Sequence, residues 1–173
     1  MSFRQYITQD FTANKDNTKG KVLTLLFRVA GYVSQRKKTK LLFFPYLILY
    51  RVFVEWMMGF ELPWTTRVGP GLRVYHGQST VINKATVIGR NCTIRHSTTI
   101  GNSKAEGASP VIGNNVEIGS NVCIIGNINI GDNVVIGAGS IVVKSLPSNS
   151  VVVGNPAKVL RIVEALIEEE VFS

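Results

Sequence analysis

Two histidines, His76 and His96, are the residues of this 173-residue chain best suited to proton transfer. His76 is the third residue of the hexad "VYHGQS", and His96 is the third residue of "IRHSTT". An imidazole titrates near neutral pH, so it can accept a proton from a hydroxyl group that attacks an electrophile. A metal site is disfavoured, because the sequence offers only two histidines and no carboxylate in the same column of the repeat. For His96, a corner residue that bonds the backbone is the structural alternative.

A repeat of six residues sets the positions of the two histidines. Apolar residues recur at steps of six, with one step of eight and one of twelve, at Val68, Val74, Ile82, Ile88, Ile94, Ile100, Ile112, Ile118, Ile124, Ile130, Ile136 and Val142. Small or apolar residues follow four positions later, at Thr86, Cys92, Thr98, Val116, Val122, Ile128, Val134 and Ser140. A period of six excludes an amphipathic helix. It predicts a mainly β fold, a parallel β-helix in which three hexads close each triangular coil.

The repeat also predicts where the histidines meet. Val74 and Ile94 are separated by one coil plus two extra residues, 80–81. His76 and His96 should therefore lie at the same corner of adjacent coils, about 5 Å apart along the axis. A second irregularity, "NSKAEGASPV" at 102–111, replaces one hexad by polar and small residues. It is either a surface insertion or a part of the same site.

The segments around the repeat carry helical patterns. Apolar spacing predicts helices over 21–35 and over 47–59, with Pro45 at a helix boundary and Gly59 as a C-cap. A short amphipathic helix is expected over 160–170. We therefore expect a helical domain over 1–60, a β-helix domain over 61–155, and a tail with a short helix over 156–173.

Charge and apolar runs restrict the environment of the protein. Residues 1–60 hold 10 Lys/Arg against 3 Asp/Glu, a net charge of +7, while the whole chain carries +8. The positive charge of residues 1–60 indicates either an ordinary solvated basic face or a surface that binds an anionic ligand or membrane. Nucleic acid is disfavoured because no basic stripe with interleaved aromatics follows. The apolar run 41–50 is shorter than the roughly 20 residues of a membrane span and is expected to form a buried helix, although its basic prelude at 36–40 leaves peripheral membrane contact open.

The start of the chain, "MSFRQYITQD", lacks the apolar stretch of a secretory signal. Cys92 and Cys123 fall inside the repeat and are expected to be free thiols. These features favour a cytoplasmic protein, with a location at the inner face of the membrane left open.

Several motifs resemble known acyltransferases. The repeat ending in "VVVGNPAKV" (151–159) resembles the acyltransferases of the left-handed β-helix class. The segment "ELPWTTRVGPGLRVYHG" (61–77) is similar to the serine acetyltransferase segment that carries a catalytic Asp and His fifteen residues apart. "ITQDFTANK" (7–15) resembles the start of that family's helical domain. The segments "YRVFVEWMMGFELP" and "VINKATVIGRNCTIRHSTTIGN" are still more similar to the colanic acid biosynthesis acetyltransferases, and the likeness extends over 5–162.

The resemblance implies catalytic roles for particular residues. It makes His76 the general base and Glu61 the carboxylate that would orient the imidazole and stabilise its protonated form. Backbone donors at Gly101 or Asn102 would stabilise the tetrahedral oxyanion. No metal is implied.

The resemblance also implies substrates. The donor is acetyl-CoA, whose pantetheine arm would lie along the β-helix between subunits; the matching positions are Asn102, Ser120, Gly137 and Ala138, with Lys144 or Lys158 near the phosphates. Serine acetyltransferases hold the amino acid with an Arg-His pair where this chain has Ala108 and Ser109, and their Asp before the catalytic His is Tyr75 here. Tyr75, His96 and Ser109 are therefore expected to contact a larger neutral acceptor.

The function that follows is acetyl transfer to a hydroxyl of a sugar in a capsular or exported polysaccharide or its precursor. Serine O-acetylation in cysteine biosynthesis is the alternative, and a non-catalytic hexapeptide-repeat scaffold is the alternative from another class. Carbonic anhydrase chemistry is disfavoured because it needs three histidine ligands. The resemblance implies a homotrimer with a site shared between subunits, and leaves open the pairing of trimers into a hexamer.

Overall fold

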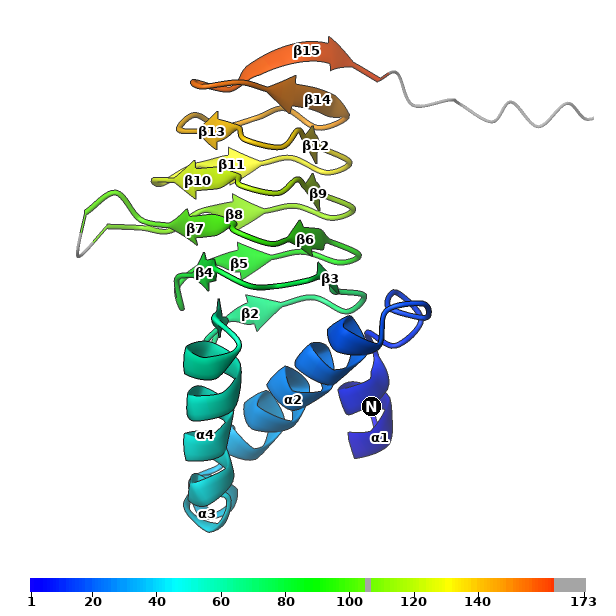
Figure 1. Ribbon diagram of the computed structural model, residues 1–173, viewed down its shortest axis with the longest axis vertical. Helices are drawn as coiled ribbons and strands as arrows, with labels where there is room; N and C mark the ends of the chain where they lie inside the picture. Colours follow the sequence, from blue (N-terminus) through cyan, green and yellow to red (C-terminus); the bar gives the residue numbers. More distant parts are fainter. Residues whose placement is uncertain (105–106, 164–173) are drawn as a thin grey trace, which may run out of the picture.

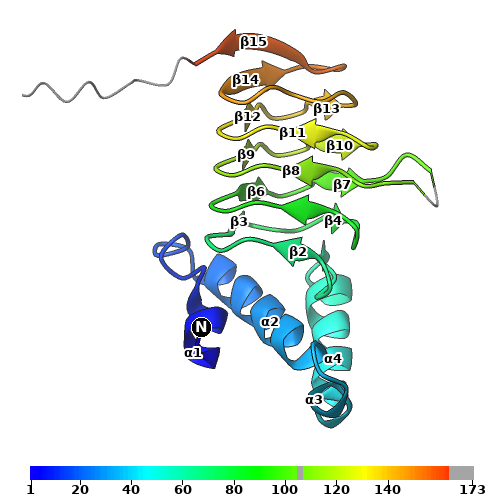
Figure 2. The same cartoon turned by 180° about the vertical axis from the view of Figure 1, so that it is seen from behind.

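The computed structural model describes residues 1–104 and 107–163 and consists of a three-sided parallel β-helix that stands on a layer of helices (Figures 1 and 2). Sheet A contains β1 (Phe60–Glu61), β4 (Thr80–Ile82), β7 (Thr99–Gly101), β10 (Cys123–Ile125) and β13 (Ile141–Val142). Sheet B contains β2 (Arg67–Val68), β5 (Val87–Ile88), β8 (Val111–Ile112) and β11 (Asn129–Ile130). Sheet C contains β3 (Arg73–Tyr75), β6 (Thr93–Arg95), β9 (Glu117–Ile118), β12 (Val135–Ile136), β14 (Ser150–Val153) and β15 (Lys158–Ile162).

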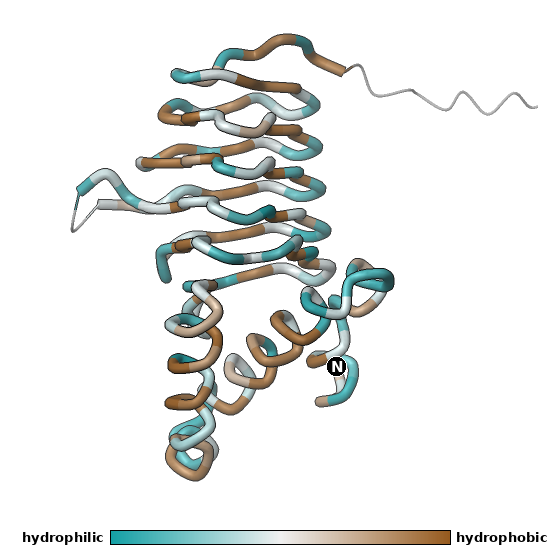
Figure 3. The backbone as a smooth tube through the Cα atoms, in the orientation of Figure 1, coloured by the Kyte–Doolittle hydropathy of each residue, from teal (hydrophilic) through white to brown (hydrophobic). Residues whose placement is uncertain are grey.

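The hexad pattern accounts for the interior of the β-helix. The apolar residues at the first hexad position stack in register from coil to coil; Val74 pairs with Ile94, and Ile94 with Ile118. All of them except the half-buried Val68 are almost inaccessible to solvent, and the residues four positions later are buried as well. In Figure 3 the apolar colour recurs at the same place in successive coils. The predicted β-helix and its period are therefore confirmed.

The chain turns at three corners in each coil. We call the corner between sheets C and A the histidine corner, since it carries His76 and His96 in successive coils. The corner between sheets B and C is the asparagine corner, which contains Asn91, Asn115, Asn133 and Asn149. The corner between sheets A and B is the loop corner, because the segment after β7 projects there as a long loop (Figure 1).

The segment 102–111 was expected to replace one hexad, and the structure differs from that expectation. If it replaced a whole hexad, the strand after β7 in sheet A would fall in sheet C. Instead the chain enters β8, which pairs with β5 and β11 of sheet B. The six extra residues are therefore an insertion at a corner, and the β-helix continues with its order of sheets unchanged.

Helices close the first coil. They are α1 (Phe3–Thr8), α2 (Thr18–Ser34), α3 (Lys37–Leu42), α4 (Phe44–Tyr50) and the π-helix η1 (Arg51–Met57), which continues α4 directly. Pro45 lies in the first turn of α4, as its lack of an N–H group favours, and Gly59 adopts a left-handed φ of 62° just after η1. The two predicted helices are thus confirmed with shifted ends.

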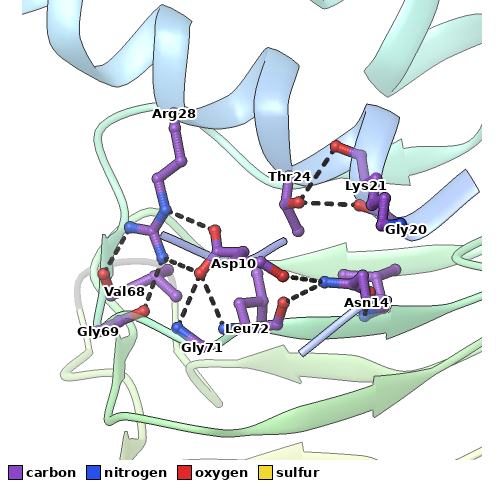
Figure 4. A network of polar contacts seen from close by, with 11 residues as sticks. Asp10, Asn14, Gly20, Lys21, Thr24, Arg28, Val68, Gly69, Gly71 and Leu72 are labelled. Carbon is purple, nitrogen blue, oxygen red and sulfur yellow. Dashed lines mark hydrogen bonds and ion pairs between the residues drawn. The ribbon is translucent and has the colours of Figure 1, made fainter. Parts of the chain in front are cut away.

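A buried polar network joins the helices to the open edge of the first coil (Figure 4). Arg28 of α2 forms an ion pair with Asp10, with 2.8 Å between Nε and Oδ2, and both side chains are almost fully buried. Asp10 accepts bonds from the N–H groups of Gly71 and Leu72, while Arg28 donates to the carbonyls of Val68 and Gly69. The network thereby satisfies backbone groups that have no neighbouring coil below them.

Two asparagines extend this cap to β3. Asn14 accepts a bond from the N–H of Val74, and Asn17 donates to the carbonyl of Val74 at 2.6 Å. Asn17 also caps the N-terminus of α2 by accepting from the N–H of Gly20. The strand that ends just before His76 is therefore held by side chains from the helical segment.

The C-terminal expectation is wrong for the residues that can be compared. Residues 158–162, which overlap the predicted helix over 160–170, form β15 and pair antiparallel with β14. The unpaired edge of β14 offers these residues a ladder of hydrogen bonds, and this tertiary contact overrides the local helical pattern. The rest of the predicted helix, 164–170, lies outside the described residues.

The run 41–50 is helical, but the expectation that it is buried is also wrong. Leu47 and Tyr50 are buried, whereas Leu41 and Leu42 are 80% and 74% exposed. Only one side of α4 faces α2, so only that stripe of the run enters the core. Within the described residues, no helix combines the length and the apolar character that a bilayer crossing demands.

Candidate functional site

The histidine corner brings together the predicted proton-transfer residues. His76 and His96 follow β3 and β6, whose residues pair Tyr75 with Arg95, so the two imidazoles stack in adjacent coils. Their ring centroids are 5.6 Å apart and the rings are inclined at 75° to each other. The predicted juxtaposition is therefore confirmed. Ser120 and Ala138 occupy the same hexad position in the next two coils and continue the column.

His76 has an unusual backbone conformation. Its φ is 66°, a positive value that few non-glycine residues adopt, and the N–H of Gly77 donates to the carbonyl of Tyr75 at 2.8 Å across it, as in a γ-turn. Gly77 also has a positive φ, and a Cβ there would lie 3.1 Å from a methyl carbon of Leu23. The long step between Val74 and Ile82 thus forms a tight turn with His76, an exposed residue, at its centre. Strained conformations of this kind cluster at functional sites.

His96 presents the opposite arrangement. It is half-buried, and its Nδ1 atom is buried with no hydrogen-bond partner among the described residues. The backbone bond that we considered as its structural role is therefore not made by Nδ1. A buried imidazole nitrogen without a partner costs free energy, on the order of 1–3 kcal/mol. The His96 ring packs edge-on against the ring of His76.

A stack of cations on an aromatic ring borders the histidines on the outer face of sheet C. The guanidinium of Arg95 lies 4.9 Å from the ring centroid of Tyr75, and that of Arg73 lies 5.9 Å from it. Arg73 also donates to the carbonyl of Ala13. Tyr75 is therefore fixed between two cations, as a neighbour of the site. The role of Arg95 was missed by sequence reasoning, although its position directly before His96 could have indicated it.

A groove continues from the histidine corner along the upper coils. It has a volume of about 340 Å³ and is lined by Arg95, Glu117, Ile118, Gly119, Ser120, Val135, Ile136, Gly137 and Ala138. Three residues predicted to contact the donor therefore share one depression. Small residues leave it open, while Arg95 supplies a positive charge at the end nearest the histidines. A larger cavity of about 630 Å³ between α2 and β2 contains none of the predicted site residues.

Gly101, Asn102 and Ser109 lie at the loop corner, across sheet A from the histidines. Asn102 accepts a bond from Asn83 at 2.9 Å and donates to the carbonyl of Lys104, and Gly101 precedes it at the end of β7. Ser109, at the base of the loop, is buried and its hydroxyl has no partner among the described residues. Within one chain, these residues and the histidines therefore cannot surround the same small ligand.

Lys144 and Lys158 are brought together near the last coil. Both line a pocket of about 160 Å³, with Val142, Val143, Pro156 and Ala157 as the other lining residues. Two ammonium groups at one pocket are compatible with a phosphate-bearing ligand, since each would act as a point charge. The pocket lies between the end of β13 and the turn that leads into β15.

Glu61 is exposed on β1 and makes no hydrogen bond or ion pair with His76 in the part of the chain that the structure describes. A second carboxylate, Glu55 of η1, is buried and is bound by Arg51 with an N–O distance of 3.3 Å. Burial raises the pKa of Glu55, Arg51 opposes that shift, and the negative charge of Glu61 adds to it. The fifteen-residue spacing to His76 thus points to Glu61, whereas no spacing in the sequence points to the buried Glu55.

Metal ligation was disfavoured from the sequence. Over residues 1–104 and 107–163, no group of three His, Cys, Asp or Glu side chains is placed to hold a metal ion.

Comparisons with known proteins place this geometry in context. A family model described as bacterial transferase hexapeptide (six repeats) matches residues 109–144. The WcaB protein of Escherichia coli strain K12, provisionally assigned as a colanic acid biosynthesis acetyltransferase, is 42% identical over 156 residues, which are 87% of this chain and 96% of that protein. The Shigella flexneri protein of the same name has the same identity and coverage.

Solved structures share the fold. Soybean serine acetyltransferase complexed with serine superposes with a TM-score of 0.79 at 29% identity, over 92% of this chain and 70% of that one. The serine acetyltransferase of Neisseria gonorrhoeae gives a TM-score of 0.77 at 30% identity, over 94% and 68% of the two chains. The predicted left-handed β-helix with N-terminal helices is thereby confirmed.

Proposed function

This chain belongs to the hexapeptide-repeat acetyltransferases, and from that premise we propose that it transfers the acetyl group of acetyl-CoA to a hydroxyl of a sugar. The observation that carries the proposal is the histidine corner, where an exposed His76 in a strained turn lies 5.6 Å from His96, measured between ring centroids. The acceptor is a sugar of a capsular or exported polysaccharide or its precursor.

In the proposed reaction His76 acts as the general base. As the acceptor oxygen attacks the thioester carbonyl carbon, a neutral His76 imidazole takes the hydroxyl proton. The carbon–sulfur bond then breaks, and the protonated His76 returns the proton to the leaving thiolate. Glu61 would fix the ring tautomer and stabilise the imidazolium, and the N–H groups at Gly101 or Asn102 would stabilise the oxyanion. Because this transfer is direct, no acyl group is attached to the enzyme.

The choice of acceptor follows from the residues at the positions where serine acetyltransferases bind the amino acid. Ala108, Ser109 and Tyr75 provide no charged pair for the carboxylate and ammonium groups of an amino acid. His96 and Ser109 would instead bind neutral hydroxyl groups of the acceptor. The assignment of WcaB to colanic acid biosynthesis supports a saccharide acceptor.

We place the donor in the groove beside Arg95, with Ser120, Gly137 and Ala138 along the pantetheine arm and Lys144 or Lys158 near the phosphates. The separation of the histidine corner from the loop corner within one chain supports a homotrimer. In such a trimer Gly101, Asn102 and Ser109 of one subunit would face the histidines of the next. Pairing of trimers through the helical layer, which would give a hexamer, is the alternative assembly.

Serine O-acetylation is the second candidate, favoured by the superposition on serine acetyltransferases. A non-catalytic scaffold is the candidate of another class. The proposed setting is the cytoplasm, at the inner face of the membrane where lipid-linked precursors are assembled.

One assay separates these candidates: thiol release from acetyl-CoA by the purified protein, with L-serine, nucleotide sugars and oligosaccharides as acceptors. Release with a saccharide that His76→Asn abolishes is the expected result. Release with serine alone would establish the second candidate, and no release with any acceptor would favour a scaffold. Light scattering on the same sample should give a trimer or a multiple of it, and a stable active monomer would contradict the shared site.

A further inference from the structure

The helical layer exposes an apolar stripe that the acetyltransferase site does not use. It runs along α3, α4 and η1 and comprises Leu41, Leu42, Phe43, Phe44, Ile48, Leu49, Phe53, Trp56 and Met57, each at least 44% exposed. The spacings of three and four residues place Leu41, Phe44 and Ile48 along one side of the helical run. Large exposed apolar patches mark binding surfaces rather than ordinary solvated faces.

Basic residues accompany the start of this stripe. Arg36, Lys37, Lys38 and Lys40 are all exposed, and Arg51 follows at the junction of α4 and η1. Residues 36–57 contain these five cations and one acidic residue, the buried Glu55, so their net charge is +4. We call the stripe together with these cations the basic apolar surface. Its composition, with Phe, Trp and Leu beside Lys and Arg, is typical of helices that lie in a membrane interface.

The position of the surface fits contact with an extended plane. In Figure 1, α3 lies at the end of the molecule farthest from the β-helix, and α4 leads from it toward the first coil. A shallow apolar pocket of about 260 Å³ lies on the same surface, lined by Phe44, Ile48 and Trp56, with Lys40 and Arg51 also among its lining residues. An acyl chain beneath an anionic headgroup has the chemistry that this pocket would accommodate.

A second copy of the chain is a less suitable occupant. Two such surfaces placed face to face would bring together two clusters of charge +4 with no exposed carboxylate between them. Like charges at that separation oppose association. An anionic lipid surface instead attracts each lysine or arginine by about 1 kcal/mol and buries the apolar residues in the same contact.

We propose that the basic apolar surface docks this protein on membranes that contain anionic phospholipids. The inference concerns a surface that contains none of the predicted site residues and does not depend on the identity of the acceptor.

Flotation with vesicles tests the proposal, using full-length protein and vesicles of phosphatidylcholine with or without phosphatidylglycerol. We expect binding to the anionic vesicles only, weakened by added salt. Lys37→Glu/Lys38→Glu/Lys40→Glu should lower the partition coefficient by roughly a hundredfold. Leu41→Asn/Leu42→Asn/Phe44→Asn should lower it to a similar extent, since it removes the apolar contact and leaves the charges.

Matched controls keep the test specific. Lys84→Glu/Arg90→Glu/Lys104→Glu changes three exposed cations on the β-helix and should alter vesicle binding by less than about threefold. Leu160→Asn and Val22→Asn change exposed apolar residues outside the surface. Thiol release from acetyl-CoA with a soluble acceptor should be the same in the Lys37/Lys38/Lys40 variant and the parent, so loss of docking is distinguishable from failure of the acetyltransferase proposal.

Three outcomes would overturn the inference. They are absence of binding to anionic vesicles, equal binding by the parent and both surface variants, and equal loss of binding in the control variants. If the Leu41/Leu42/Phe44 variant instead reduces the mass measured by light scattering and the parent does not bind vesicles, the surface is an interface between copies of this chain.

Discussion

The asparagine corner and the histidine corner occur in the same coils and differ in how fully their polar atoms are paired. At the asparagine corner, the side-chain amides of Asn91, Asn115 and Asn133 each donate to the side-chain oxygen of the asparagine in the next coil, at 2.8–3.2 Å, and the series ends at Asn149. All four have φ between 54° and 58°, a conformation that asparagine tolerates. The corner therefore carries a continuous ladder in which exposed side chains bond one another.

The histidine corner has no such ladder. The column His76, His96, Ser120 and Ala138 changes residue type at almost every coil, and no side-chain hydrogen bond joins its members in the part of the chain that the structure describes. His76 takes a positive φ at the centre of a tight turn, and Nδ1 of His96 is buried without a partner among the described residues. One corner has side chains that bond one another, and the other has side chains that form no such bonds within the described residues.

The largest expected effect is on catalysis at the histidine corner. His76→Asn should lower turnover of acetyl-CoA by roughly a hundredfold or more, because asparagine keeps the left-handed turn but cannot act as a base. The measurement is thiol release together with the melting temperature. His76→Ala should lose the same activity and also some stability, because alanine disfavours the positive φ. Near-normal turnover in the folded His76→Asn variant would show that His76 is not the general base.

The next effect is on stability at the asparagine corner. Asn115→Ala should lower the free energy of unfolding by about 2 kcal/mol, since it removes two bonds of the ladder and places alanine at a φ of 55°. Asn115→Gly should cost less, because glycine accepts that φ. Denaturant unfolding measures both variants. Turnover per folded molecule should remain that of the parent; a catalytic defect here would break the distinction between the corners.

A smaller catalytic effect is expected at His96. His96→Ala should raise the acceptor KM by about tenfold with little change in kcat, because the proposed contact binds the acceptor and does not move its proton. His96→Gln, which restores a polar group, should recover part of the loss. A loss confined to kcat would instead make His96 a participant in proton transfer.

The smallest expected effect is on the labelling rates of the two cysteines, one near each corner. Cys92 follows Asn91 and is fully buried, and burial raises its pKa to about 11. Cys123 follows the histidine corner of a later coil and is half-buried; burial raises its pKa as well. Because the thiolate is the reactive form and its fraction falls as pH drops below the pKa, both should react slowly at pH 8. Iodoacetamide followed by mass spectrometry should label Cys123 first, and Asn115→Ala should accelerate labelling of Cys92.

Much of the fold was predictable because a β-helix is specified locally. Each apolar residue from Val74 to Val142 is placed by its own hexad, and stacking repeats one contact from coil to coil. The same arithmetic put His76 beside His96 without any knowledge of distant contacts. The family motifs added Ser120, Gly137 and Ala138, which the structure places in one groove.

The sequence did not reveal which residues lie close enough together to contact the same ligand. Asn102 and His96 are six residues apart, yet they lie at different corners because β7 of sheet A separates them. Arg95 is identified only by its contact with the Tyr75 ring, and Glu55 only by the burial that raises its pKa. Whether Glu61 orients His76 is still a prediction.

The sequence by itself determined the period, the sheets and the stacking of the histidines, because those depend on residues six positions apart. Only the tertiary structure decided the two ends. Residues 158–162 became a strand because the edge of β14 was unpaired, and the run 41–50 remained largely exposed because α2 covers one side of α4 alone. At both ends there is no next coil to repeat the contact, so the outcome depends on whichever surface is available for pairing.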